Sequence, residues 1–349
     1  MTKSIKIGAN EVTRDGMPFV IAEIGNNHQG SVDIARQMFK AAQESGVNAV
    51  KLQKRNNKKL YTEKLFNSPY DNEFSFGDTY GKHREALEFG HDEYLELKRY
   101  GQELGLVVFS TAFDFDSADF LQDIDFPLFK IASGDLKNIP FIKYVASFGK
   151  PMLVSTGGGS LEDVQRVYDA VLPINPNLIL LQCTSSYPVE PRDMNLRVIK
   201  SFRKEFPHAI IGLSDHQSGI AMAIVGFTLG ARVIEKHFTL NRAWKGTDQS
   251  FSLEPVGMKK LVRDLNRAYE ALGDGIKRPL PVEVKPLAKM GKKLVAAADL
   301  PAGHILRDQD IAIKSPGDGL APYEIDNVIG KKLVKPLVMD ENITYEILA

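Results

Sequence analysis

Short apolar segments rich in β-branched residues recur along the first two thirds of the chain, and most of them end in polar residues. Each segment is too short for a helix. Its apolar residues are also continuous, where a half-exposed strand would alternate them with polar ones. This pattern is typical of a strand buried on both faces of a parallel sheet. The segments are residues 19–25, 49–53, 107–111, 128–134, 151–157, 178–184, 210–216 and 233–239.

Amphipathic helical patterns lie between these predicted strands, so that strand and helix alternate along the chain. Eight strand–helix units over about 250 residues fit a (β/α)8 TIM barrel, and we predict this α/β fold for residues 1–273. A doubly wound sheet is the structural alternative, but it usually has fewer strands. The clearest helical patterns are residues 32–45, 92–104, 161–171, 196–206 and 219–229.

Four segments differ from the repeating units. Residues 1–18 predict a small N-terminal hairpin that plugs the bottom of the barrel, and residues 60–90 form a long inserted loop, which is typical of a functional lid. Residues 274–287 are rich in proline and glycine and predict a linker. Residues 288–349 predict a small, mainly-β C-terminal domain. A domain of that size is marginally stable alone, so we expect it to dock on the barrel or on a partner chain.

The composition narrows the classes of function. The 349 residues carry 44 basic and 44 acidic side chains, a balance that argues against nucleic-acid binding. No apolar run approaches the roughly 20 residues that span a bilayer, and the first residues lack the apolar stretch of a signal peptide. The single cysteine, Cys183, has no partner for an internal disulfide. We therefore expect a soluble globular protein of the reducing cytoplasm, without a membrane segment.

Charged and hydroxyl side chains occur at the ends of the predicted strands, where barrel enzymes carry their active sites. Lys51 and Lys130 lie inside apolar strands, and a buried charge is costly unless it is paired or neutralised by a ligand. One interpretation pairs these lysines with Glu23 and Glu235 inside the barrel. The sharper interpretation is an anionic substrate, with further hydrogen bonds from hydroxyl groups. The candidate hydroxyls are those of Thr111, Ser133, Ser155 and Ser214.

Two histidines, His216 and His237, end neighbouring predicted strands, so their imidazoles can approach each other at the barrel rim. A single buried histidine is more often a hydrogen-bonded structural residue, but two at equivalent depth favour a metal site. Water and substrate oxygens would fill the other positions, as in an open Lewis-acid site rather than a closed structural zinc. His28 follows the first strand, and its spacing does not decide between a substrate contact and a loop-ordering role.

In these same segments the sequence resembles the sialic acid synthase family, enzymes that condense phosphoenolpyruvate with an aldose to make nonulosonic acids. The resemblance covers almost the whole chain and includes the family's antifreeze-like (SAF) domain at the C-terminal end. Each motif alone is short, and their order makes the resemblance specific. The motifs are residues 22–30 (AEIGNNHQG), 50–53 (VKLQ), 110–113 (STAF), 129–135 (FKIASGD), 155–157 (STG), 213–216 (LSDH) and 235–239 (EKHFT).

The resemblance implies roles for single residues. It implies a divalent metal on His216 and His237, with Mn²⁺ preferred and Mg²⁺ or Co²⁺ as alternatives, and it implies Glu23 as the catalytic carboxylate. It also implies a homodimer in which the SAF domain reaches the active site of the neighbouring subunit. The implied ligands of the co-substrate phosphoenolpyruvate are Lys51, Thr111, Lys130, Ser133, Ser155, Ser185 and Ser214, and the implied sugar contacts are Gln53, Asp135, Tyr187 and Asp248.

Two positions depart from the best-studied family pattern, and both concern substrate recognition rather than the condensation site. Ser315 stands where that pattern has an arginine before Pro-Gly, and Ser185 stands where it has an asparagine. The candidate sugars are therefore N-acetylmannosamine, its 6-phosphate, and the diacetamido sugars that lead to legionaminate- or pseudaminate-type products. Another phosphoenolpyruvate-dependent 3-deoxy-sugar-acid synthase, or a metal aldolase, is an alternative on the same barrel. A non-catalytic carbohydrate- or ice-binding protein is a further alternative, which leaves the polar strand ends unexplained.

Overall fold

The computed structural model describes residues 3–349 of the chain. It divides into two compact units, with the division between Gly273 and Asp274. Each unit has its own hydrophobic core.

The first unit is a closed barrel of parallel strands in which the last strand, β10, returns to pair with the first, β3. The strands follow one another in chain order around the barrel, and almost all of their residues are buried, which explains the continuous apolar runs in the sequence. Closure of the sheet confirms the predicted barrel, because a doubly wound sheet would keep two free edges. The strands are β3 (Phe19–Gly25), β4 (Ala49–Lys54), β5 (Val107–Ala112), β6 (Phe129–Ile131), β7 (Met152–Ser155), β8 (Leu178–Cys183), β9 (Ile210–Asp215) and β10 (Val233–His237).

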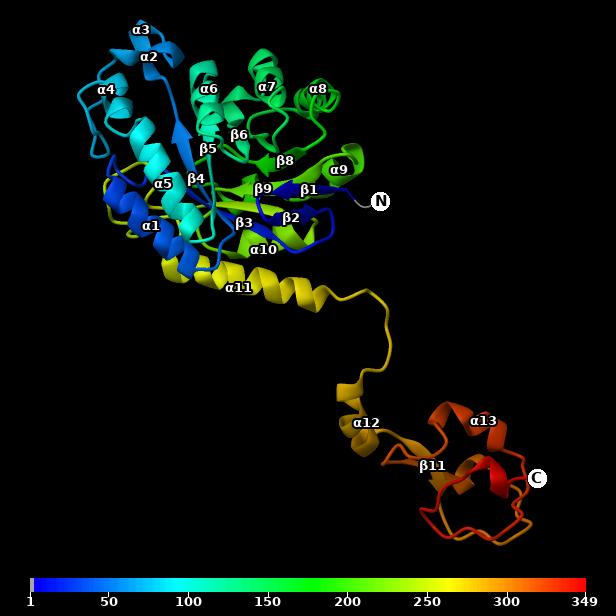
Figure 1. Ribbon diagram of the computed structural model, residues 1–349. Coiled ribbons are helices and arrows are strands. Elements are labelled where there is room, and N and C mark those ends of the chain that lie inside the picture. Colours follow the sequence, from blue (N-terminus) through cyan, green and yellow to red (C-terminus); the bar gives the residue numbers. More distant parts are fainter. Residues whose placement is uncertain (1–2) are drawn as a thin grey trace. The chain divides into compact units, whose positions relative to one another are not determined.

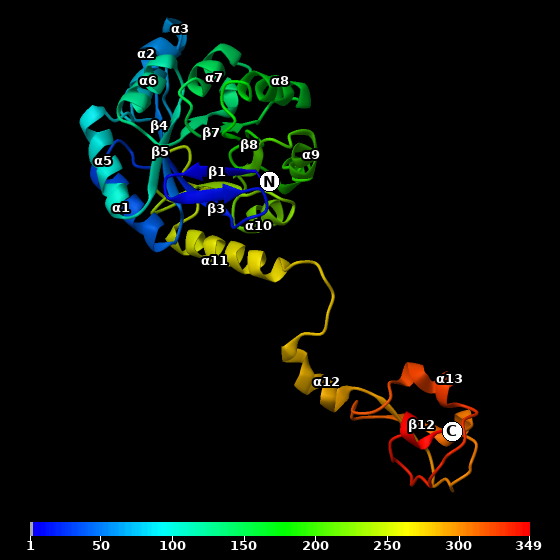
Figure 2. The same ribbon diagram turned by 45° about the vertical axis from the view of Figure 1, so that its right-hand side comes forward.

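Helices surround the barrel on its outside (Figure 1 and, turned by 45°, Figure 2). Several begin at residues that satisfy free backbone N–H groups. Ser31 accepts a hydrogen bond at the start of α1, and Ser160 with Asp163 forms a capping box before α8. The main helices are α1 (Val32–Glu44), α5 (His91–Glu103), α6 (Phe115–Asp123), α7 (Ile139–Ala146), α8 (Leu161–Val171), α9 (Val198–Glu205), α10 (Ala221–Thr228) and α11 (Pro255–Leu272).

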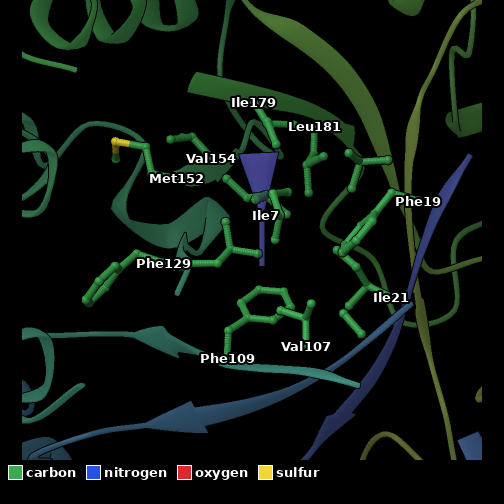
Figure 3. Packing of buried hydrophobic residues seen from close by; sticks show 14 of the residues in the cluster. Ile7, Phe19, Ile21, Val107, Phe109, Phe129, Met152, Val154, Ile179 and Leu181 are labelled. Carbon is green, nitrogen blue, oxygen red and sulfur yellow. The ribbon is translucent and has the colours of Figure 1, made fainter. Parts of the chain in front are cut away.

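An N-terminal hairpin packs against the bottom of the barrel. Its strands β1 (Ser4–Ile7) and β2 (Asn10–Thr13) pair antiparallel, and Ile7 is fully buried. In Figure 3 the Ile7 side chain lies among apolar residues from the N-terminal parts of the barrel strands. The hairpin thus adds to the apolar layer at this end, and polar side chains are left to the opposite end. The neighbours labelled there include Phe19, Ile21, Val107 and Phe109.

The segment predicted as a long inserted loop contains short helices rather than irregular chain alone. They are α3 (Glu63–Phe66) and α4 (Tyr80–Glu85), and a further short helix, α2 (Asn57–Leu60), ends where the segment begins. Aromatic rings hold the segment together, because the ring of Tyr70 lies 5.5 Å from that of Tyr80 and 4.5 Å from that of His83.

The second unit is small and has antiparallel strands, as predicted. Strand β11 (Lys293–Ala296) pairs with β12 (Ile311–Lys314), and isolated bridges connect further extended segments. The predicted linker is partly helical, because α12 (Val284–Met290) begins inside it. Pro286 is compatible with this helix since it lies in the first turn, where its missing N–H group has no partner to lose. Within residues 3–349, no helix is both long enough and apolar enough to cross a membrane.

Candidate active site

Polar side chains from the barrel strands meet at the C-terminal end of the barrel. Alternate residues of a strand share one face, so Thr111 lies above Phe109 on the inner face of β5, and the interior changes from apolar to polar along the strand. The polar side chains line a cavity of about 660 Å³. The predicted site residues that line it are Glu23, Lys51, Gln53, Thr111, Lys130, Ser133, Ser155, Ser185, Tyr187, Ser214, His216, His237 and Asp248.

Asp135 is the predicted site residue that does not line this cavity. It ends a short 3-10 turn, Ser133–Asp135, in which Ser133 and Gly134 face the cavity. The Asp135 carboxylate instead accepts a hydrogen bond of 3.1 Å from the side chain of Asn138. The tight turn separates the directions of neighbouring side chains, which a strand pattern does not predict.

Lys51 and Lys130 are paired with carboxylates inside the barrel. Lys51 Nζ lies 2.7 Å from Glu23 Oε2 and 3.9 Å from Glu235 Oε1, and Lys130 Nζ lies 2.8 Å from the same Glu235 oxygen. All four side chains are at least 96% buried. Lys51 also donates to Thr111 Oγ1 at 2.8 Å. Both lysines are therefore paired with glutamates inside the barrel, as the first interpretation of the sequence proposed. Because both lysines also line the cavity, they are still available to bind an anionic substrate.

The two carboxylates of this network differ in acidity. Burial favours the neutral form of Glu235, but Lys130 and Lys51 outweigh it and lower its pKa to about 2. Burial raises the pKa of Glu23 above its ordinary value, although Lys51 opposes the shift, while Glu235 adds to it. Glu235 is thus a fixed negative charge, whereas Glu23 is the carboxylate better suited to exchanging a proton.

A glycine lets three hydroxyl-bearing segments approach each other. The backbone N–H of Gly157 donates to Ser133 Oγ at 3.0 Å. A Cβ atom at residue 157 would lie 2.8 Å from that same oxygen and would also collide with Ser185 Oγ. Gly157 therefore brings the end of β7 close to Ser133 and Ser185 without a steric clash.

His216 and His237 lie side by side, with ring centroids 5.3 Å apart. His216 Nδ1 is 2.9 Å from the carbonyl oxygen of Thr184. A carbonyl only accepts, so Nδ1 carries a proton, and the neutral tautomer with this hydrogen bond has its free lone pair on Nε2. Burial lowers the pKa of His237 to about 4, which keeps its imidazole neutral.

The pair fits an open metal site rather than a closed one. His237 Nδ1 is buried and makes no hydrogen bond within residues 3–349, and the nearest carboxylate oxygen, Asp248 Oδ2, is 3.7 Å away. In the same described range, no group of three or more His, Cys, Asp or Glu side chains is arranged to hold a metal. The residues therefore offer two imidazole nitrogens as ligands, and a divalent metal would need further oxygen ligands from water or substrate.

The sequence patterns did not identify two arginines that line the same cavity, Arg55 and Arg84. Arg55 lies just past the end of β4 and continues the alternation of Lys51 and Gln53. This two-residue spacing could have predicted from the sequence that Arg55 faces the cavity. Arg84 belongs to α4 in the inserted segment, and its position in the sequence contains no comparable signal. Phe113, Cys183 and Thr247 are further lining residues that were not predicted.

A closed barrel with charged, hydroxyl and imidazole groups in a cavity at its C-terminal end defines a (β/α)8-barrel enzyme of small anionic substrates. Comparison with known families gives the same assignment. Residues 38–277 match the NeuB family, and residues 293–349 match the SAF domain.

Individual relatives match over nearly their full length. The chain is 41% identical over 331 residues to N-acetylneuraminate-9-phosphate synthase of Homo sapiens, covering 95% of this chain and 92% of the relative. It is 34% identical over 334 residues to N,N'-diacetyllegionaminic acid synthase of Legionella pneumophila, covering 94% of each. The crystal structure of N-acetylneuraminic acid synthetase from Leptospira borgpetersenii superposes with a TM-score of 0.72 at 30% identity, over 82% of this chain and 95% of that one.

The chain belongs to the NeuB family and carries its SAF domain. The resemblance to sialic acid synthases seen in the sequence motifs is thereby confirmed, as is the prediction that the protein is a synthase of this type.

Proposed function

We propose that this protein condenses phosphoenolpyruvate with an open-chain N-acetylated amino sugar and releases inorganic phosphate. The observation that carries the proposal is the set of Lys51, Lys130 and hydroxyl groups that lines one cavity together with His216 and His237. Two ammonium groups suit a small molecule with both a carboxylate and a phosphate, which phosphoenolpyruvate has. The nonulosonate synthase names of the relatives support the same reaction.

The reaction forms one carbon–carbon bond, and at C2 of phosphoenolpyruvate it replaces the bond to the phosphate oxygen with a bond to an oxygen from water. The vinyl carbon of phosphoenolpyruvate attacks the aldehyde carbon of the sugar, whose oxygen takes up a proton, and positive charge develops at C2 of phosphoenolpyruvate. Water adds to C2 and loses a proton, and the tetrahedral intermediate expels phosphate to leave a ketone.

We assign Lys51 and Lys130 to hold the carboxylate and phosphate, with Thr111, Ser133, Ser155, Ser185 and Ser214 as hydrogen-bond donors. Glu23 accepts the proton of the attacking water, a role that suits its raised pKa. The proposed sugar contacts in the cavity are Gln53, Tyr187 and Asp248. For Asp135, which lies outside the cavity lining, the role remains a prediction from the resemblance.

We also propose a divalent metal on His216 and His237, with Mn²⁺ preferred over Mg²⁺ or Co²⁺. When bound, such an ion supplies Lewis-acid polarisation of the sugar aldehyde. The buried Nδ1 of His237, which has no hydrogen bond within the described residues, supports this assignment.

The metal proposal has a direct test. His237→Ala should reduce Mn²⁺ binding, measured by titration calorimetry on chelator-treated protein, and Mn²⁺ should no longer restore its activity. His208→Ala, which changes an exposed histidine, is the control. Unchanged Mn²⁺ binding by the His237 variant would contradict the proposal.

We further propose a homodimer in which the SAF unit contributes to the active site of the neighbouring subunit, in the reducing environment of the cytoplasm. Exposed apolar side chains on the second unit support a docking role, among them Tyr323, which is 82% exposed, and Val338, which is 61% exposed. The buried free thiol of Cys183 is compatible with a reducing compartment.

One assay tests the proposed reaction. Phosphate release should require phosphoenolpyruvate and an amino sugar, offered as N-acetylmannosamine, its 6-phosphate or the diacetamido-trideoxyhexoses. Arabinose 5-phosphate and erythrose 4-phosphate are the matched controls for the alternative, a 3-deoxy-sugar-acid synthase on the same barrel. Release with these shorter sugar phosphates but with none of the amino sugars would overturn the proposal.

A further inference from the structure

Two arginine side chains, Arg55 and Arg84, line the same cavity as the proposed reaction centre. Neither was needed to account for phosphoenolpyruvate, the metal or the attacking water. Arg55 follows β4 and is 93% buried, and Arg84 lies on α4 and is half-buried.

The guanidinium group of Arg55 is held in place by an amide oxygen and an aromatic ring, and no carboxylate is hydrogen-bonded to it. Its Nη2 donates to Gln53 Oε1 at 2.5 Å, and the group stacks over the Phe113 ring at 3.8 Å. Its Nη1 is buried and makes no hydrogen bond to any of residues 3–349. The nearest carboxylate oxygen on Glu88 is 3.8 Å away, and Glu88 also pairs with Lys54 at 3.2 Å.

Arg84, unlike Arg55, makes no ion pair with a carboxylate within residues 3–349. Its Nε and Nη2 donate to the hydroxyl oxygen of Tyr80, each at 3.2 Å. Within residues 3–349, no carboxylate oxygen lies within ion-pair distance of this guanidinium group. Burial lowers the pKa of Arg55, and the positive charge of Arg84 lowers it further, so the two groups are close enough to repel each other. Two such cations facing one cavity are most stable when an anion lies between them.

The position of Arg55 indicates which part of a substrate it meets. Lys51, Gln53 and Arg55 are alternate residues, so Arg55 lies roughly 13 Å from Lys51 at about 3.3 Å per residue. Lys51 belongs to the proposed phosphoenolpyruvate pocket, and Gln53 is the proposed sugar contact between the two. An extended sugar whose aldehyde faces the reaction centre directs its other end, carbon 6, toward Arg55.

We infer that Arg55 and Arg84 form a second anion subsite that binds a phosphate group on carbon 6 of the amino sugar, so that the substrate is a hexosamine 6-phosphate. This inference rests on the proposed condensation reaction. A phosphate dianion matches two guanidinium groups in charge and in hydrogen-bonding geometry. A 6-deoxy sugar would place a methyl group against the same two charges, so the diacetamido-trideoxyhexoses are excluded as preferred substrates.

The test uses the full-length protein as wild type, Arg55→Gln, Arg84→Gln and the double variant. Lys82→Gln is the matched control, because Lys82 lies on the same helix but is exposed and pairs with Asp78. Binding of N-acetylmannosamine and of its 6-phosphate is measured by titration calorimetry, and phosphate release is measured with each sugar and phosphoenolpyruvate.

Wild type should prefer the 6-phosphate, and each substitution should weaken its binding about 10- to 100-fold, as expected for a charge-assisted hydrogen bond. The double variant should bind both sugars with equal affinity, and its KM for phosphoenolpyruvate should be unchanged. The Lys82 variant should match wild type.

The inference is overturned if wild type does not prefer the 6-phosphate. It is also overturned if the double variant loses affinity for both sugars by the same factor, because the preference for the 6-phosphate would then remain. Turnover of the unphosphorylated sugar with no phosphate preference would reject the subsite but retain the proposed function. An arginine-dependent preference in binding, with no phosphate release from any amino sugar, would retain the subsite and reject the proposed function.

Discussion

At the scale of single residues, the candidate site depends on four buried charges that compensate one another. Lys51, Lys130, Glu23 and Glu235 are all within 4 Å of an oppositely charged partner. A bound anion adds to a site that is already neutral, so the hydroxyl groups and the polar cavity wall must contribute to its binding. The pKa of Glu23 is raised and that of Glu235 is lowered, and we therefore assign the proton-transfer role to Glu23.

Replacement of Glu23 tests that role. Glu23→Gln should lower kcat for phosphate release by about 100-fold or more, since general-base catalysis contributes on the order of 10²–10⁴. Affinity for phosphoenolpyruvate should persist, because the substitution removes a negative charge beside Lys51. Steady-state kinetics and a separate phosphoenolpyruvate titration measure the two effects, with the exposed Glu44→Gln as control. Near-normal turnover would contradict the role of Glu23.

A buried histidine should make the barrel sensitive to acid. His28 stacks on Phe89 at 4.1 Å, and burial lowers its pKa to about 3. Below an unfolded-state pKa of about 6.5, the unfolded chain takes up a proton that the folded protein does not, so the free energy of unfolding falls as the pH falls. At pH 5 this single residue should account for a loss of about 2 kcal/mol.

The acid sensitivity is measured by urea unfolding at pH 7 and pH 5. In His28→Asn, the loss between the two pH values should be about 2 kcal/mol smaller than in wild type. His208→Asn, at an exposed position, should behave as wild type. An equal pH dependence in wild type and the His28 variant would reject this account.

At the scale of elements, the two ends of the barrel have separate tasks. The hairpin of β1 and β2 packs against the apolar end, and the cavity opens among the polar strand ends. Each strand runs from the apolar end of the barrel to the polar end. The residues that stabilise the fold and those that line the cavity therefore lie on the same strands, at opposite ends. Substitutions at the bottom should therefore change stability without changing substrate affinity.

The hairpin provides the test. Ile7→Ala should lower the free energy of unfolding by about 3 kcal/mol, because it removes a fully buried side chain and leaves a cavity. The KM for phosphoenolpyruvate should stay within twofold of wild type. Lys6→Ala, at an exposed position of the same strand, is the control. A large change in KM with unchanged urea stability would show that the hairpin acts on the site instead.

At the scale of the whole molecule, the chain consists of two units with separate cores. The core cluster of the barrel contains residues up to Leu265, and the second cluster starts at Leu294. The barrel should therefore fold without the second unit, whereas the proposed contribution of the SAF unit to a neighbouring site predicts that activity needs both.

Truncation after Gly273 separates these two requirements. The shortened chain should unfold cooperatively in urea and retain its circular dichroism spectrum, but it should release phosphate at less than 1% of the full-length rate. Full activity of the truncated chain would refute the proposed role of the second unit.

The sequence by itself determined the positions of the barrel strands and most of the site, because buried parallel strands are continuously apolar and polar residues at their ends are conspicuous. Glu23, Lys51, Lys130 and both histidines were identifiable in this way. Only the tertiary structure decided which charges meet: Lys130 and Glu235 are 105 positions apart in the chain and lie 2.8 Å apart in the barrel. It likewise placed Arg84 in the cavity and Asp135 outside it, since an inserted helix and a tight turn follow no strand periodicity. The pattern of hydrophobic and polar residues along the sequence indicates which residues are buried. Closure of the barrel, which that pattern does not specify, brings side chains that are distant in the sequence into contact.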